Sequence, residues 1–393
     1  MNKKGEICLG MAGAGRATEL HMEALKRFSG IPVCYKHIIA QRQEQVIQAK
    51  ERYGFIHSSL NFEDLLNDDE IDVIDVCTPP YAHASMVEKI LKAGKHAICE
   101  KPLTGYFGDE EDQQPIGNKV SKSRMYEKLL HSLGHLESVV KESGKMFMYA
   151  ENFIYAPAVT KAAEIIQQKK SRILYAKGEE SLKGSSSPVA GEWNKTGGGT
   201  FIRTGAHPLS AILWLKKLEG EVRGEAVTVK SVYADMSQVT THLSPYEHRH
   251  ISAQPNDVED CATVILTFSD GSKSVIIATD TLLGGSKNYL ELYCNDAVIN
   301  CKLTMSDLMS TYFLDEDHLE KVALSEMLPS KIGWNPIFLE DVIVRGYVDE
   351  MRDFMESIYY NRMPKSDFWL ASETIKIIYA AYKSSERNET IHL

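Results

Sequence analysis

Two spacings of apolar residues alternate along the first 150 residues. Continuous apolar runs such as Glu6–Ala12 and Ile71–Cys77 are typical of buried strands, whereas the spacing of three or four in Ala82–Ala93 is typical of an amphipathic helix. This alternation predicts parallel strands joined by right-handed crossovers, and so a doubly wound α/β sheet. The other elements predicted here are strands at Val33–Ala40, His96–Cys99 and Met146–Ala150, and helices at Arg16–Phe28, Gln41–Arg52, Phe62–Leu66 and Met125–Glu142.

The pattern changes after about residue 150, where strand-like runs follow one another directly. Asp270-Gly271 between two of these runs is a hairpin signal, which favours antiparallel pairing. We therefore predict a dinucleotide-binding Rossmann domain at residues 1–150 and an α+β domain with a large, mostly antiparallel sheet at residues 151–393. The predicted elements are strands at Ile173–Lys177, Val227–Ala234, Ala262–Phe268, Ser274–Thr279 and Tyr289–Cys294, and helices at Ala156–Gln168, Val348–Tyr360 and Ala371–Ser384.

Two polar segments interrupt these patterns. Residues 105–122 predict a long exposed loop, either a mobile lid or a disordered insertion. Residues 236–256 contain His242, His248 and His250. A His-x-His pair can bind zinc or copper, but we interpret this segment as an exposed loop and predict no metal site.

Composition narrows the class of protein. The 393 residues carry a net charge of −10, which argues against general binding of nucleic acid or of anionic membrane surfaces. No apolar run approaches the roughly 18 residues of a membrane-spanning helix. The seven cysteines form no Cys-x-x-Cys pair, so reduced, buried thiols are expected. We expect a cytoplasmic enzyme of more than one domain.

A glycine motif lies between the first predicted strand and helix. Gly13-Ala-Gly15-Arg-Ala-Thr18 matches G-x-G-x-x-G except for Thr18 at the third position. The glycines permit a tight turn and let the backbone approach a pyrophosphate bound at the helix N-terminus. We therefore expect Gly13, Gly15, Arg16 and Ala17 to contact a dinucleotide.

The end of the second strand bears on the choice of cofactor. A carboxylate there binds the ribose 2′-hydroxyl of NAD in many such sheets, but this strand ends in Ala40-Gln41-Arg42. Arg42 could bind a 2′-phosphate, so NADP is preferred over NAD. In the alternative interpretation, Arg42 is a solvated residue at a helix start and Gln41 serves NAD.

Two further motifs follow predicted parallel strands, at the carboxyl ends where such sheets bind ligands. One runs from Cys77 through Thr78-Pro79-Pro80 to His83, and the other is Glu100-Lys101-Pro102-Leu103 after Gly94-Lys95-His96. In this order they resemble the Gfo/Idh/MocA oxidoreductases, the group of glucose–fructose oxidoreductase and inositol dehydrogenase. The resemblance implies that the cofactor is contacted by Cys77, Thr78, Pro79, His83, Glu100 and Lys101.

The resemblance extends over most of the chain outside residues 105–122 and about 236–256. Residues 197–207, from Gly197-Gly198-Gly199 to His207, are similar to the family's GGG…D-x-G-x-H motif, and Val258-Glu259-Asp260 is similar to its V-E-D. The resemblance implies hydride transfer between a nicotinamide cofactor and a secondary alcohol or ketone of a sugar, cyclitol or glycoside. His207 matches the family's acid/base histidine, and Lys101 matches the lysine that polarises the reacting oxygen or tunes the histidine.

The substrate half departs from the family's pattern. Arg203 stands where an aspartate often precedes the histidine by four residues, and Ser210 replaces another common aspartate. A nearby guanidinium would lower the pKa of the histidine, or could bind an acidic or heavily hydroxylated substrate. Trp193 could stack on a sugar ring or simply pack. The expected substrate contacts are Asn152, Trp193, Arg203 and His207.

Two other functions remain possible on this fold: cleavage of a glycoside through transient oxidation by bound NAD, and a cofactor-sensing regulator without activity. Retention of both Lys101 and His207 argues against the regulator. The resemblance also implies a second-domain sheet with one open face, which would be buried in a homodimer or homotetramer. The expected partner is a small carbohydrate-like molecule, not nucleic acid or a membrane.

Overall fold

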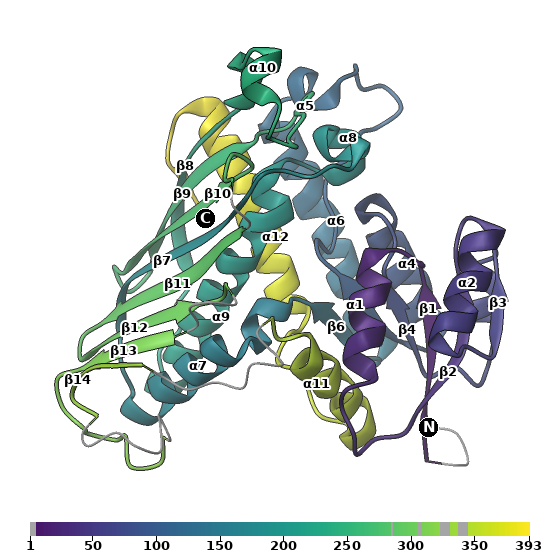
Figure 1. Ribbon diagram of the computed structural model, residues 1–393, viewed down its shortest axis with the longest axis horizontal. Coiled ribbons are helices and arrows are strands. Elements are labelled where there is room, and N and C mark those ends of the chain that lie inside the picture. The colour runs from purple at the N-terminus through teal and green to yellow at the C-terminus, as the bar shows by residue number, and fades with distance from the viewer. Residues whose placement is uncertain (1–4, 284–285, 305–308, 323–330, 337–344) are drawn as a thin grey trace. The chain divides into compact units, whose positions relative to one another are not determined.

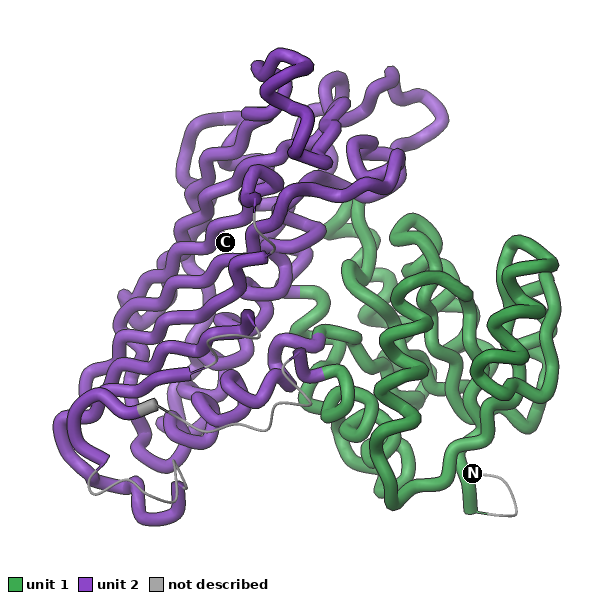
Figure 2. Tube along the Cα trace, viewed as in Figure 1, with its two compact units in different colours: residues 1–105, 128–151, 347–372 green, residues 106–127, 152–346, 373–393 purple. Residues whose placement is uncertain are grey.

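The computed structural model describes residues 5–283, 286–304, 309–322, 331–336 and 345–393 (Figure 1). The chain forms two compact units (Figure 2), which are described separately. Both are discontinuous, so the predicted division into residues 1–150 and 151–393 does not follow the compact units everywhere. Unit 1 comprises residues 1–105, 128–151 and 347–372, and unit 2 comprises residues 106–127, 152–346 and 373–393.

Six parallel strands form the sheet of unit 1 in the order β3-β2-β1-β4-β5-β6, which confirms the predicted doubly wound sheet. The order reverses between β1 and β4, and this reversal opens a crevice at the carboxyl ends of the two strands. The strands are β1 (Ile7–Ala12), β2 (Val33–Ile39), β3 (His57–Ser59), β4 (Val73–Val76), β5 (His96–Glu100) and β6 (Phe147–Ala150). The helices are α1 (Arg16–Leu25), α2 (Gln43–Tyr53), α3 (Glu63–Leu66), α4 (Pro80–Lys92), α6 (Lys122–Ser143, its first turns in unit 2) and α11 (Tyr347–Tyr360).

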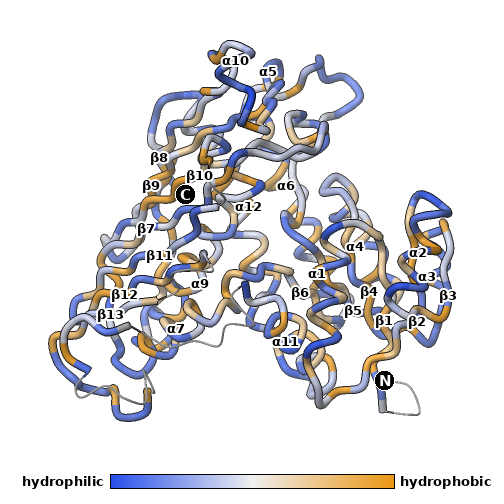
Figure 3. Tube along the Cα trace, viewed as in Figure 1, coloured by the Kyte–Doolittle hydropathy of each residue, from blue (hydrophilic) through white to orange (hydrophobic). Residues whose placement is uncertain are grey.

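A C-terminal helix completes the core of unit 1. α11 packs against α1 and β1, although more than 300 residues separate them in the chain. Every residue of β1 and β4 is buried, as expected for central strands covered on both faces. Figure 3 shows hydrophobic residues along β1. The packing explains why residues 347–372 belong to this unit.

Nine strands form the sheet of unit 2 in the order β14-β13-β12-β11-β7-β10-β9-β8-β15. Among the described strands only β7 and β10 pair in parallel, so the predicted mostly antiparallel sheet is confirmed. The strands are β7 (Ile173–Leu182), β8 (Val229–Ser237), β9 (Cys261–Phe268), β10 (Lys273–Thr279), β11 (Ser286–Cys294), β12 (Ala297–Lys302), β13 (Met309–Phe313), β14 (Gly333–Pro336) and β15 (Ile391–His392). The helices are α5 (Ile116–Lys119), α7 (Pro157–Lys169), α8 (Trp193–Thr196), α9 (Ala206–Arg223), α10 (Pro245–His248) and α12 (Phe368–Arg387, its first residues in unit 1).

One face of this sheet is covered and the other is open. α9 packs on β7, and α7 packs on α9 and β12 (Figure 1). Gly178 on β7 permits the close approach of α9, because an added Cβ would lie 2.7 Å from Cβ of Pro208. Buried and more accessible residues alternate along β8, β9 and β10, as the open-faced sheet requires.

Residues 106–122 belong to unit 2 and are ordered there, so a disordered insertion is not what the structure shows, whereas several of these residues, among them Glu110, Glu111 and Gln113, are exposed as predicted. The Tyr106 amide donates to the Tyr379 hydroxyl at 2.5 Å, and the Gly117 amide donates to Oδ2 of Asp257 at 2.8 Å. Ile116 is fully buried. In the part of the chain that the structure describes, no helix has both the length and the apolar character needed to cross a bilayer.

Candidate functional site

The glycine turn of unit 1 lies at the point where the strand order reverses. Gly13 has a φ of +118°, and an added Cβ would lie 2.4 Å from the Cys77 carbonyl oxygen. Only glycine therefore allows the turn after β1 to approach the loop after β4 so closely. Gly15 precedes α1, and an added Cβ there would meet no atom within 4 Å, which leaves room above the first turn of the helix.

A cavity of about 500 Å³ opens beside this turn. Gln41 and Gln45 line it from the end of β2 and the start of α2, and the Gln45 amide donates to the Ala14 carbonyl at 2.9 Å. Arg42 is exposed at the start of α2 and is not among the residues that line this cavity. The predicted cofactor residues Gly13, Gly15, Cys77, Thr78 and Pro79 all line the cavity.

His83 on α4 joins the two motifs that follow β4 and β5. Its Nδ1 lies 2.7 Å from the Pro102 carbonyl oxygen and its Nε2 lies 2.8 Å from the Thr78 carbonyl oxygen. The ring is 1% exposed, and burial lowers the pKa of His83, although both carbonyl contacts oppose this shift. With both nitrogens engaged by backbone, His83 braces the two loops rather than facing the cavity.

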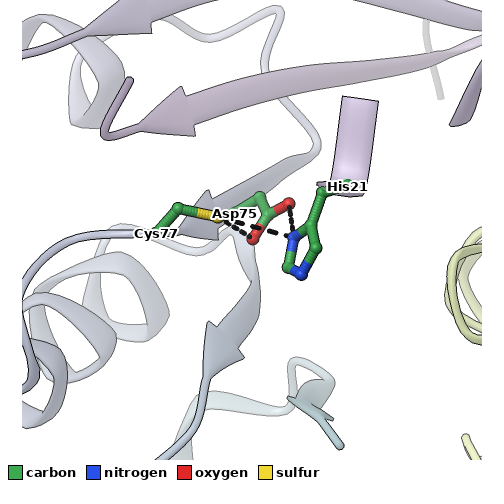
Figure 4. Close-up of side chains that lie close together, drawn as sticks. All are labelled: His21, Asp75 and Cys77. Atoms are coloured by element: carbon green, nitrogen blue, oxygen red, sulfur yellow. Dashed lines mark hydrogen bonds and ion pairs between the residues drawn. The ribbon is translucent and has the colours of Figure 1, made fainter. Parts of the chain in front are cut away.

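His21, Asp75 and Cys77 form a buried polar cluster in the core of unit 1 (Figure 4). His21 Nδ1 on α1 lies 2.8 Å from Oδ2 of Asp75 on β4, and both side chains are fully buried. His21 Nε2 lies 3.3 Å from Oε1 of Glu100, whose Oε2 accepts the Lys101 amide at 2.9 Å. The sequence analysis missed His21 and Asp75, although a histidine and an aspartate in otherwise buried elements were a usable signal.

The charge state of His21 follows from these neighbours. Burial alone lowers the pKa of His21, but the nearby Asp75 carboxylate opposes this, and the pKa of His21 lies well above its ordinary value of 6.5. Glu350 on α11 is also fully buried, and burial raises the pKa of its carboxyl well above the ordinary range, partly offset by the charge of His21. We therefore assign an imidazolium at His21 and a protonated carboxyl at Glu350.

A pH dependence of stability follows from the raised pKa of His21. The contribution of His21 to the free energy of unfolding should be complete below its pKa in the unfolded chain, about 6.5. It should decline as the pH rises toward the pKa of His21 in the folded protein. Nitrogen NMR should find an imidazolium at neutral pH, and the decline in unfolding free energy should be smaller in His21→Gln. A neutral ring at neutral pH would contradict the assignment.

In unit 2, the glycine run of residues 197–199 is held by Glu259. Oε2 of this buried carboxylate accepts the Gly199 amide at 2.9 Å and Oε1 accepts the Phe201 amide at 2.8 Å. The Tyr382 hydroxyl donates to Oε1 at 3.0 Å. An added Cβ at Gly199 would lie 1.9 Å from the Glu259 carbonyl oxygen, so the glycine is required for this contact.

His207 and Arg203 lie beyond this run, where a π-helical turn (Phe201–Gly205) leads into α9. The His207 ring stacks on Phe153, with centroids 4.7 Å apart and an interplanar angle of 20°. Arg203 forms an ion pair with the buried Asp280, which immediately follows β10. Asp280 is a further residue that the sequence analysis missed, because nothing in the local pattern linked it to Arg203.

Arg203 and Asp280 line a second cavity, of about 330 Å³, within unit 2. Ser185, Ser187 and Gln254 also line it. Burial raises the pKa of Asp280 above 3.8, while the adjacent Arg203 guanidinium works against the increase. The charge of Arg203, which could have bound an acidic substrate, is thus balanced from within the unit.

Two predicted substrate residues serve packing instead. Trp193 is 2% exposed, packs against the rings of Tyr379 and Tyr382, and donates from Nε1 to the Tyr106 carbonyl at 3.1 Å. Its ring therefore has no face for a sugar. Asn152 is buried and donates from its amide to the Arg345 carbonyl at 2.8 Å, which fastens the chain before α11.

Comparisons with known proteins agree with the fold and the motifs. Residues 7–115 match "Oxidoreductase family, NAD-binding Rossmann fold", and residues 166–300 match "GFO/IDH/MocA C-terminal domain". Levoglucosan dehydrogenase of Pseudarthrobacter phenanthrenivorans is 26% identical over 294 residues, 70% of this chain and 67% of that protein. An uncharacterised oxidoreductase of Bacillus subtilis is 30% identical over 291 residues, 73% of this chain and 71% of that protein.

Another curated relative matches over 103 residues only, and the chain spans 32% of that protein's length. Among solved structures, levoglucosan dehydrogenase in complex with NADH and levoglucosan is similar with a TM-score of 0.75 and 20% identity, over 98% of this chain and 99% of that one. At this identity the likeness concerns the fold. The two family matches and the Bacillus relative together establish that the chain belongs to the GFO/IDH/MocA oxidoreductase family, with an NAD-binding Rossmann fold.

Proposed function

We propose that the protein is an NAD(P)-dependent dehydrogenase that transfers hydride between a nicotinamide cofactor and a secondary alcohol or ketone of a sugar, cyclitol or glycoside. The observation that supports this most is the cavity of about 500 Å³ at the strand-order reversal, lined by the glycine turn and by the loop after β4. Lys101 directly follows β5, the strand next to β4. The similarity to levoglucosan dehydrogenase supports a carbohydrate-like substrate.

The residues around this cavity suit a dinucleotide. The turn at Gly13 and the space above Gly15 would admit a pyrophosphate at the start of α1, beside the amides of Arg16 and Ala17. Thr78 and Pro79 would border the nicotinamide half. When bound, the cofactor supplies the acceptor or donor of hydride.

Lys101 and His207 have complementary roles in the proposed oxidation. His207 takes the hydroxyl proton as the carbon–hydrogen bond breaks with its electron pair, which leaves a ketone. The Lys101 ammonium stabilises negative charge on the reacting oxygen. In the reverse direction His207 returns the proton to the oxygen of the ketone.

The second cavity favours a neutral polyol over an acidic substrate. The Arg203 guanidinium already pairs with the Asp280 carboxylate, and a second carboxyl group, that of Glu259, also lines the cavity, so its charges do not favour an acidic substrate. Serine hydroxyls, an amide and this ion pair can donate to and accept from the hydroxyl groups of a sugar.

For the cofactor we retain the preference for NADP, which depends on Arg42. Arg42→Ala is expected to weaken NADP binding about tenfold or more, because a phosphate contact is lost, and to change NAD binding little. Arg27→Ala removes another exposed arginine of unit 1 and should affect neither. Titration calorimetry with both cofactors decides the question, and equal effects on NAD and NADP binding would contradict the assignment of Arg42 to the 2′-phosphate.

We also propose a homodimer or homotetramer formed through the open face of the unit 2 sheet. Tyr233 and Ile265 are partly exposed there and lie opposite each other in the register of β8 and β9. Light scattering should give a mass of two or four chains, and Ile265→Lys should lower it. A monomeric wild-type protein would contradict this proposal.

A screen of sugars, cyclitols and glycosides with NAD⁺ and NADP⁺ tests the proposed activity. We expect reduced cofactor and a keto product from at least one substrate. Release of an aglycone without net reduction would instead indicate the glycoside-cleaving reaction. Tight cofactor binding without turnover of any compound would favour the regulator.

A further inference from the structure

We infer that His21 and His83, neither of which lines the cofactor cavity, are positioning residues that hold Lys101 from its two sides. Lys101 is the first residue after β5, between Glu100 and Pro102. His21 contacts the side chain of the residue before it, and His83 contacts the carbonyl of the residue after it. The inference rests on the proposed role of Lys101.

The contacts of His21 connect three elements of unit 1, namely α1, β4 and β5. Asp75 on β4 engages Nδ1 of His21, which directs Nε2 toward Glu100. The contact between Nε2 and Oε1 at 3.3 Å is an ion pair rather than a directed hydrogen bond. The other oxygen of Glu100 accepts the Lys101 amide at 2.9 Å, so a movement of His21 would be transmitted to the Lys101 backbone.

The His83 side ties the same loop to α4. The Pro102 carbonyl oxygen lies 2.7 Å from Nδ1, and the Thr78 carbonyl oxygen lies 2.8 Å from Nε2. A neutral imidazole can donate to only one of two such acceptors, whereas an imidazolium can donate to both. The two contacts place the ring between the loop after β4, which lines the cofactor cavity, and the loop that contains Lys101.

A metal centre is the alternative use of this cluster. His21, Asp75 and Cys77 could each offer one ligand atom, and all three are buried. However, His21 Nδ1 and Asp75 Oδ2 are 2.8 Å apart, whereas two ligands about 2.0 Å from a tetrahedral zinc lie about 3.3 Å apart. Burial also raises the pKa of the Cys77 thiol to about 12, which disfavours the thiolate that binds metal. The geometry is that of a hydrogen-bonded network.

Substitutions that retain one contact at a time separate positioning from simple packing. The amide of His21→Asn can take the place of Nδ1 toward Asp75 but does not reach Glu100, whereas that of His21→Gln can reach Glu100. His83→Gln can bond only one of the two carbonyls. His37→Gln is the matched control, because His37 is a buried histidine on β2 with its ring against His57.

With a substrate from the screen, we expect kcat to fall about 10- to 100-fold in His21→Asn and His83→Gln, since small displacements of a catalytic group have effects of this size. His21→Gln should restore part of the loss. Cofactor affinity should stay near that of His37→Gln, and the loss of kcat should persist at temperatures where each variant is fully folded. Losses of kcat that merely parallel losses of stability or cofactor affinity would overturn the inference.

A second readout needs no turnover, so it remains decisive if the proposed activity fails. Lysines are reductively methylated with ¹³C-formaldehyde, and the Lys101 signal is assigned by its disappearance in Lys101→Arg. We expect this signal to shift in His21→Asn and His83→Gln but not in His37→Gln, while that of Lys95, held by the Asp68 and Ile71 carbonyls, stays in place. An unchanged Lys101 signal in both variants would overturn the inference.

Discussion

Replacing Lys101 by methionine should lower kcat by about 10²- to 10⁴-fold, the usual contribution of a side chain that manages charge or protons at the reacting atoms. Methionine keeps much of the aliphatic length but lacks the ammonium, so the negative charge that develops on the oxygen loses its partner. The fold should be unaffected, because Lys101 is only partly buried. Steady-state kinetics with the substrate found in the screen measures the effect.

The control for this substitution is Lys92→Met. Lys92 is an exposed lysine in the last turn of α4 whose ammonium pairs with Glu88. Its loss should leave kcat, KM and cofactor affinity nearly unchanged. If Lys101→Met kept wild-type kcat, or if both variants lost activity equally, Lys101 would not act at the reacting oxygen.

Replacing Glu259 by alanine should lower the free energy of unfolding by about 3–5 kcal/mol. The substitution leaves the Gly199 and Phe201 amides and the Tyr382 hydroxyl without their acceptor in a buried setting. Chemical denaturation measures the loss, and His207, on α9 directly after this turn, should lose its fixed position along with the glycine run.

Two further variants serve as controls for Glu259→Ala, one conservative and one on the surface. Glu259→Gln keeps an acceptor oxygen and a similar volume, so it should lose less stability than Glu259→Ala. Glu221→Ala removes an exposed glutamate of α9 that pairs with Lys217, and should cost less than about 1 kcal/mol. Equal stability of Glu259→Ala and Glu221→Ala would show that the carboxylate does not hold the glycine run.

The Rossmann half could be predicted closely because its strands and helices differ in period. For example, Val33–Ala40 was predicted as a strand and β2 spans Val33–Ile39. By contrast α9 was not predicted, because most of its residues, from Ala206 to Gly220, are buried and no polar face marks its period. Strands β12 to β14 were also not identified from the pattern.

Among the residues of the candidate site, the sequence pattern likewise predicted some and missed others. Local motifs located Gly13 and the Glu259 segment, because their chemistry is concentrated in a few consecutive positions. The role of Trp193 could not be decided from the sequence, because an aromatic residue beside a glycine run fits a cleft and a core equally well, whereas in the structure its ring is buried. The partners of Arg203 and His21 come from distant strands, and only the folded chain brings them together.

Isotope transfer shows whether the protein moves hydride between its substrate and the nicotinamide. A substrate from the screen is deuterated at the carbon to be oxidised and incubated with the protein and oxidised cofactor. We predict deuterium at C4 of the reduced nicotinamide and a keto product in equal amount. With Lys101→Met we predict almost none of either. Folded, cofactor-bound protein that converts the substrate without moving deuterium to the nicotinamide would contradict the proposed hydride transfer.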